Sequence, residues 1–70
     1  MSFFDSYPVL QEALVTTKTG RTFKGVIWQR RNQYLVLRNA ILLREREEPL
    51  AMSGDLVIAE ANVDYLQVVG

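Results

Sequence analysis

Residues 18–31 read KTGRTFKGVIWQRR, and the pattern of this stretch predicts how the chain begins to fold. The pair Thr19-Gly20 predicts a tight turn, because glycine accepts a positive φ without steric penalty. After the turn, Phe23, Gly25 and Ile27 alternate with outward positions, as one buried face of a strand does. A glycine inside a strand is typical of a bend or bulge, which curls a short sheet into a barrel. The stretch therefore predicts a hairpin that leads into a strongly bent sheet.

The two-residue period continues on both sides of this hairpin. Alternate residues from Ala13 to Thr17 share one face, and the polar run at 29–33 predicts the next turn. The almost continuously apolar run at 34–43 predicts a long central strand that is covered on both faces. The run REREEPLAMSG at 44–54 predicts a charged and then flexible loop. We expect strands at about residues 13–19, 22–29, 33–43, 55–60 and 63–69.

The first residues of the chain predict a short helix at about residues 4–12. Asp5 or Ser6 could cap this helix, and Pro8 suits a first helical turn. Five short strands after one helix are typical of a small SH3-like or OB-like barrel. We therefore predict an all-β fold in one domain, residues 1–70, with a five-stranded antiparallel barrel after the helix.

The length of the chain limits the stability of that domain. A domain of about 60 to 70 residues buries only about 60% of its unfolded surface, so its core alone is marginal. The chain has no cysteine and no histidine, which excludes disulfides and removes the usual zinc ligands. We expect association with further copies of the chain to supply the missing stability.

Several function classes are disfavoured by the sequence. No apolar run approaches the roughly 20 residues that span a bilayer, and MSFFDSYPVL lacks the basic start of a signal peptide. We expect a cytoplasmic protein without membrane contact.

Asp55, Glu60 and Asp64 carry oxygen ligands for a hard cation, but their spacing matches no known metal loop. No nucleophile–base arrangement is present, so we expect no enzyme, no metal and no cofactor.

Positive charge is concentrated in the first half of the chain. The formal net charge is zero, yet seven of the eight basic residues lie between Lys18 and Arg44, where no acidic residue occurs. Lysine and arginine beside aromatic rings are typical of sites that bind phosphates and stack bases. The alternative is that these residues are solvated outward positions, some paired with acidic residues of a neighbouring copy. The candidate nucleic-acid contacts are Lys18, Arg21, Lys24, Arg30, Arg31, Tyr34 and Arg38.

The pattern of glycine and apolar residues resembles the Sm and Sm-like proteins over nearly the whole chain. The residues that match the first Sm motif are Val15, Thr17, Gly20, Arg21, Phe23, Gly25, Ile27, Leu35, Val36, Leu37, Asn39 and Ala40. Those that match the second are Gly54, Ile58, Asn62, Val63 and Leu66. The resemblance implies an Sm-like barrel, ring-shaped homo-oligomers and RNA binding.

The chain departs from the family where bases are bound. Sm-like proteins that bind uridine-rich RNA carry an Asp and an Asn between the second and third strands, where this chain has RNQY at 31–34. The Arg-Gly of the second motif is replaced by Ala59-Glu60, and Glu60 would repel a phosphate. No base-binding residue of the family is therefore transferred to this chain, and we expect phosphate contacts to dominate.

The last strand and one tryptophan are candidate contacts with other proteins. The strand at 63–69 is apolar and predicts an open edge that templates pairing with another chain, unless the N-terminal segment covers it. Trp28 is opposite the core face, which favours a partner contact over a stacking platform. Tyr34 flanks Arg31 and is either a stacking residue or a tyrosine at the edge of the core. The candidate oligomer interface is Leu56, Ile58, Tyr65, Gln67, Val68 and Val69.

Two hypotheses follow from the sequence. The first is a ring-forming Sm-like homo-oligomer that binds RNA or single-stranded DNA, mainly through phosphates, with a role in nucleic-acid processing. The second is a structural subunit of a larger assembly without nucleic acid, such as a phage assembly, where very small SH3-like barrels are common. Binding to an oligonucleotide at low salt distinguishes the two.

Overall fold

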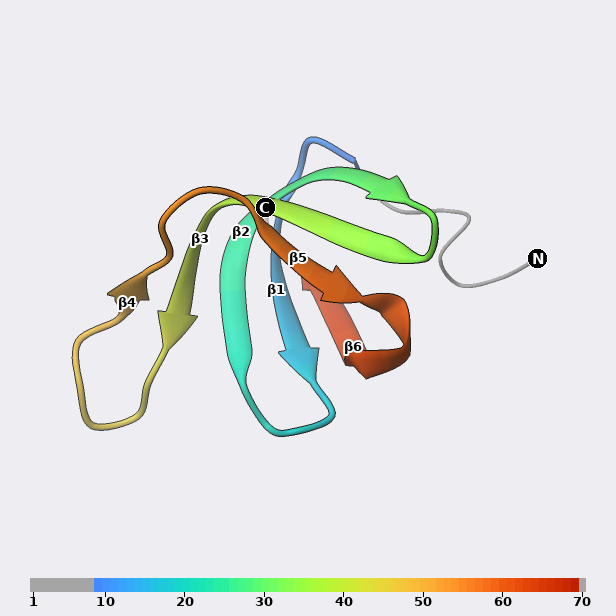
Figure 1. Cartoon of the computed structure of the whole chain (residues 1–70). Helices are drawn as coiled ribbons and strands as arrows, with labels where there is room; N and C mark the ends of the chain where they lie inside the picture. The colour runs from blue at the N-terminus through green and yellow to red at the C-terminus, as the bar shows by residue number, and fades with distance from the viewer. Residues whose placement is uncertain (1–8, 70) are drawn as a thin grey trace.

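A computed structural model describes residues 9–69, which form a six-stranded antiparallel sheet (Figure 1). The strand order is β4-β3-β2-β1-β6, and β5 pairs with the first part of β3. The all-β prediction is confirmed, with six strands where five were predicted. The elements are β1 (Glu12–Thr17), β2 (Thr22–Arg31), β3 (Tyr34–Leu43), β4 (Leu50–Ala51), β5 (Leu56–Ala59), the 3₁₀ turn η2 (Glu60–Asn62) and β6 (Val63–Val68).

The sheet bends where β2 passes close to β3. A Cβ atom built on Gly25 would lie 3.1 Å from Ala40 Cα and 3.2 Å from the carbonyl oxygen of Arg38. The register shifts at this point, and Asn39 takes a φ of 56°. A second shift leaves Trp28 as an extra residue on β2. Bulges increase local twist and bending, so the predicted role of Gly25 in the curvature is confirmed.

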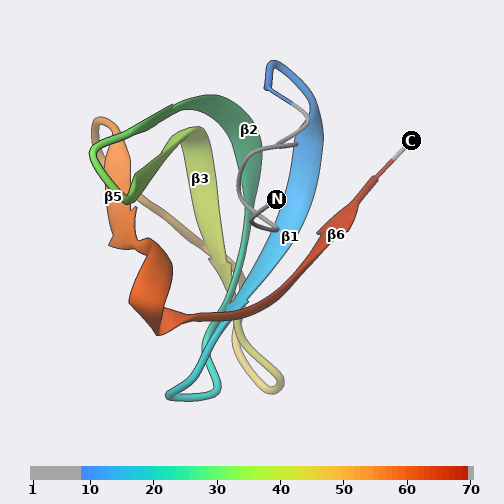
Figure 2. The ribbon, with the colours of Figure 1, turned by 90° about the vertical axis from the view of Figure 1, so that its right-hand side faces the viewer.

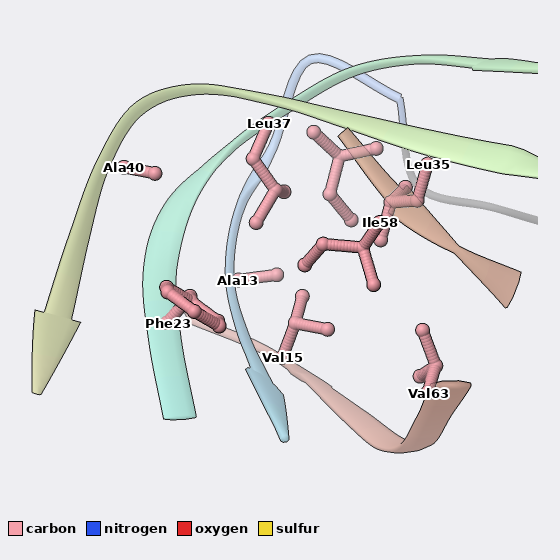
Figure 3. Close-up of a cluster of buried hydrophobic side chains, with 9 residues drawn as sticks. Ala13, Val15, Phe23, Leu35, Leu37, Ala40, Ile58 and Val63 are labelled. Carbon is pink, nitrogen blue, oxygen red and sulfur yellow. The ribbon is translucent and has the colours of Figure 1, made fainter. Parts of the chain in front are cut away.

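The concave side of the bent sheet holds the hydrophobic core. The core side chains point toward one another from β1, β2, β3, β5 and the start of β6 (Figure 3). Leu42, Met52, Leu56 and Leu66 pack against its margin. The core therefore draws on almost every strand while remaining small. Its members are Ala13, Val15, Phe23, Ile27, Leu35, Leu37, Ala40, Ile58 and Val63.

The barrel is not closed. Within residues 9–69, β5 pairs with β3 and β6 pairs with β1, but β5 and β6 do not pair with each other. Figure 2 shows the two strands leaving the η2 turn in different directions. Each of them therefore has one edge without a strand partner among the described residues.

The predicted N-terminal helix is wrong in the part that the structure describes. Residues 4–8 of that prediction lie outside the described residues, and 9–11 form a turn and bend before β1 starts. The amide of Leu10, at a φ of 67°, donates to the carbonyl oxygen of Ile27 (2.6 Å). The amide of Ile27 donates to the carbonyl oxygen of Gln11 (2.9 Å), so this segment pairs with β2 instead of with itself. No helix in the described range is long and apolar enough to cross a membrane.

Two further sequence predictions need correction. The turn expected at 29–33 is confined to Asn32 and Gln33, because Arg31 pairs with Tyr34 and β2 continues to that point. The loop expected at 44–54 contains β4, in which Leu50 pairs with Leu42. A two-residue strand is too short to show a two-residue period in the sequence. Its position is determined by its pairing with the end of β3.

Candidate nucleic-acid interface

A cleft of about 640 Å³ lies between the β2–β3 turn and the segment that joins β5 to β6. Two positive side chains, one tyrosine, one glutamine and one carboxylate line it, and the remaining walls are small or apolar. The cleft therefore has both polar and apolar walls and is large enough for a planar ring. Its lining residues are Lys18, Arg30, Gln33, Tyr34, Ala59, Glu60, Ala61 and Val63.

Backbone hydrogen bonds fix the walls of this cleft. Asn32 and Gln33 have φ values of 50° and 67°, which are typical of a two-residue turn that matches the twist of a hairpin. The amide of Glu60 donates to the carbonyl oxygen of Gln33 (2.9 Å). The amide of Lys18 donates to the carbonyl oxygen of Asn62 (2.8 Å), which ties the β1–β2 turn to the end of η2. Three segments that are far apart in sequence are thus held together around the cleft.

Glu60 is the buried charge of the cleft, with 8% of the residue exposed. The Nε of Arg30 donates to Oε1 of Glu60, and its Nη2 donates to Oε2 (3.5 Å). The Arg30 side chain is itself one-third exposed. A buried carboxylate is tolerated when it is paired with an opposite charge and accepts hydrogen bonds. Arg30 supplies both the opposite charge and the hydrogen bonds to Glu60. The predicted repulsion of phosphate by Glu60 is reduced by the same pairing.

The predicted basic contacts do not gather on one surface. Lys18, Arg30 and Tyr34 lie in the cleft. Lys24 pairs with Glu12 (3.7 Å), and Arg21 lines a separate hollow beside Thr19. Arg31 lines another groove with Tyr34, and Arg38 binds an acidic residue on the outer face. The seven predicted residues are therefore distributed among several sites.

Trp28 and Arg38 form one compact cluster. The guanidinium of Arg38 lies over the Trp28 ring, 3.7 Å from its centroid. Its Nε and Nη2 also donate to the two carboxylate oxygens of Asp55, at 3.1 and 3.3 Å. Trp28 is 39% exposed, with one ring face covered by its own chain. Arg38 therefore contacts two other side chains of its own chain.

The outer face of β3 and β5 carries a second groove of about 370 Å³. Val57 pairs with Val36 on this face, and Tyr34 is next to them. Tyr34 therefore borders both this groove and the cleft. The half-exposed Val57 was not among the residues selected from the sequence, because the alternation alone does not indicate which strand lies at an edge.

The predicted interface residues lie on β5, on β6 or directly after β6, and their side chains differ in exposure. Tyr65 is 57% exposed and Val57 is 56% exposed, which are large values for side chains of this kind. Val68, Val69 and Gln67 are also exposed, whereas Leu56 is half-buried. The side chain of Ile58 packs into the core, so this residue offers only its backbone at the strand edge.

Comparison with known proteins identifies the fold. No family model matches the chain, and no curated protein matches its sequence. The structure is similar to a heptameric archaeal Sm protein, with a TM-score of 0.77 and 17% identity over 89% of this chain and 90% of that one. It is also similar to the Pyrococcus abyssii Sm protein in complex with a uridine heptamer, with a TM-score of 0.75 and 24% identity over 87% of this chain and 86% of that one. The chain therefore has the Sm fold, as the resemblance implied.

Proposed function

We propose that copies of this chain form a closed ring by pairing β5 of one copy with β6 of the next, and that the ring binds single-stranded RNA in the cleft. The observation that carries the proposal is the open barrel, in which β5 and β6 each keep one edge without a strand partner in residues 9–69. Unpaired strand edges readily template pairing with another chain. A head-to-tail contact between two different edges closes into a ring when its rotation permits.

The side chains on the two edges support this pairing. Leu56 pairs with Leu37 and Leu66 pairs with Val15, so both face the core side of the sheet. Val57 and Tyr65 face the opposite side. If β5 and β6 of adjacent copies continue one sheet, both leucines lie on the inner face of the junction and the valine and the tyrosine lie on its outer face. Such a junction buries apolar surface that the small core of one copy leaves exposed.

Two residues of the cleft suit RNA. Lys18 makes no ion pair among the described residues, so its ammonium group is available for a phosphate. Tyr34 is 49% exposed and offers a ring on which a base can stack, worth about 1–3 kcal/mol. A ring repeats this site in every copy, and linked weak sites raise the overall affinity by about 10²–10⁴. The structural neighbours, one heptameric and one bound to a uridine heptamer, support the same assignment.

Native mass spectrometry at micromolar concentration tests the ring. We expect one closed oligomer for the unchanged chain and monomers for Val57→Glu, because a carboxylate on β5 would be buried in the junction. Leu50→Glu is the matched control, since Leu50 is comparably exposed but lies on β4. A monomeric unchanged chain would contradict the ring, as would equal effects of the two variants.

Fluorescence anisotropy with a labelled uridine heptamer over a salt series tests RNA binding. We expect Lys18→Glu to weaken binding and to reduce the salt slope by about 0.7, the value for one phosphate on a single strand. Arg44→Glu reverses a positive charge in the same way on the β3–β4 hairpin, where Arg44 pairs with Glu47, and is the control. Lys18 is a better test than Arg30, because removing Arg30 would also leave Glu60 without this ion pair. Equal weakening in both variants would contradict binding in the cleft.

The second candidate function is a structural ring subunit that binds no nucleic acid. It is favoured by the fact that Lys24, Arg30 and Arg38 already pair with acidic residues of their own chain. The two candidates share the ring and differ only in the anisotropy experiment. An oligomer that leaves RNA heptamers of every base composition unbound at low salt would select the structural function.

A further inference from the structure

We propose that the cleft selects guanine over uracil, with the Glu60 carboxylate as the residue that determines specificity. This inference rests on the proposed RNA function and names the base class that the cleft accepts. Its starting point is the position of Glu60, which lines the cleft and is only 8% exposed. A charged acceptor at the wall of a site that would hold a base restricts which base edges can approach it.

The carboxylate is held in place and retains capacity for further bonds. Arg30 donates to both of its oxygens, and the amide of Glu60 donates to the carbonyl oxygen of Gln33 (2.9 Å), which fixes the residue at both ends. An ionised carboxylate offers about four acceptor positions, of which the fork from Arg30 takes two. The remaining acceptor positions can be filled only by hydrogen-bond donors of a ligand, because an ionised carboxylate donates no hydrogen bond.

The base edges differ in how well they meet this requirement. Guanine presents N1–H and the N2 amino group side by side, two donors that one carboxylate can accept together. Adenine and cytosine present one amino donor beside a ring nitrogen that is an acceptor. Uracil presents a single N3–H between two carbonyl oxygens, both of which a carboxylate repels. Complementarity to a fixed carboxylate is therefore greatest for guanine and least for uracil.

The charge of the cleft allows a nucleotide to enter despite the carboxylate. Arg30 compensates the charge of Glu60, and Lys18 adds a second positive charge to the lining of the cleft. Tyr34 supplies a stacking surface that does not distinguish one base from another. Selectivity is thus left to Glu60, while the lysine and the tyrosine supply affinity.

Three labelled RNA heptamers test the inference on the unchanged protein by fluorescence anisotropy. They are all-uridine, alternating guanosine and uridine, and the same alternating sequence with inosine in place of guanosine. We expect the guanosine heptamer to bind about tenfold or more tightly than the uridine heptamer, since a bidentate contact discriminates by about that factor. Inosine keeps N1–H and lacks the amino group, so we expect an intermediate affinity. Tighter binding of uridine, or equal binding of inosine and guanosine, would overturn the inference.

The variant Glu60→Gln provides a second test. An amide of the same size has one acceptor oxygen, so we expect the guanosine preference to fall several-fold while uridine binding is kept or improved. Thermal unfolding of the variant checks that it folds, and the inosine comparison does not depend on this variant.

Failure of the proposed function and failure of this inference give different results. If no heptamer binds, the proposed function fails and this inference with it; if the uridine heptamer binds best, the inference alone fails.

Discussion

Replacing Gly25 by alanine tests the close approach of β2 and β3, on which the bend of the sheet depends. The added methyl group would lie 3.1 Å from Ala40 Cα and 3.2 Å from the Arg38 carbonyl oxygen. Both atoms belong to the backbone of β3, so neither can rotate away as a side chain would. Ordinary contacts of a Cβ atom begin near 3.4 Å, and the two strands must therefore separate by a few tenths of an ångström.

The expected destabilisation follows from two opposing effects. Inserting a methyl group into a tightly packed position costs about 1–3 kcal/mol. Alanine restricts the unfolded chain more than glycine does, which returns about 0.4–1 kcal/mol. We expect Gly25→Ala to lower the free energy of unfolding by about 1–2 kcal/mol, and Tm by about 5–15 °C for a domain of this size.

Urea and thermal unfolding at one fixed protein concentration measure this change, because oligomerisation makes Tm depend on concentration. The double variant with Ala40→Gly is the matched control. It removes the Ala40 Cβ atom at 3.4 Å but leaves the two closer backbone atoms, so we expect it not to restore stability. A neutral or stabilising Gly25→Ala, or full rescue by Ala40→Gly, would refute the reasoning from backbone contact.

Three further substitutions test the core, the β2–β3 turn and the outer cluster by urea unfolding. Leu37 is fully buried, so we expect Leu37→Ala to lower the free energy of unfolding by about 2–5 kcal/mol; a decrease well below about 2 kcal/mol would mean that the core is not packed as described. Gln33 has a φ of 67°, and we expect Gln33→Gly to raise stability by about 1 kcal/mol; destabilisation would contradict strain in the turn. The Arg38–Asp55 pair is about 40% exposed, so we expect Arg38→Ala to cost only about 1 kcal/mol while changing Trp28 fluorescence; an unchanged spectrum would contradict the stacking.

The bent hairpin and the strand faces could be predicted because they depend on local patterns. The glycine of the β1–β2 turn has a φ of 90°, as Thr19-Gly20 indicated. Phe23 and Ile27 are buried on the face that their spacing assigned to the core. Gly25 lies where β2 and β3 approach closely, as a glycine inside a strand indicated. Each of these features is decided by a few adjacent residues.

The long central strand was predicted correctly in extent but not in its surroundings. Apolar residues on both faces of β3 predicted cover on both sides, and Leu35 and Leu37 are indeed buried. On the opposite face Val36 is buried, yet Tyr34 is half exposed beside the exposed Val57. A continuous apolar run predicts that both faces of a strand are buried. It does not predict whether the residues that bury each face belong to the same chain.

The charge pattern could not reveal which basic residues remain available. Arg38 meets Asp55 and Arg30 meets Glu60 through strand pairings that bring together residues 17 and 30 positions apart. Folding therefore brings into contact opposite charges that are segregated along the sequence. Lys18 lines the same cleft as Glu60, yet within residues 9–69 the carboxylate is paired with Arg30 and not with the lysine.

The position of η2 links assembly to binding if copies pair as proposed. This turn carries Glu60 and ends at Asn62, and the open strands β5 and β6 lie directly before and after it. Pairing both strands with neighbouring copies would hold both ends of η2, and with them one wall of the cleft. If pairing stabilises this wall beyond what its own hydrogen bonds do, a copy in the ring binds RNA more tightly than a free copy. RNA and ring formation should then stabilise each other by the same factor, because coupling between two binding events is reciprocal.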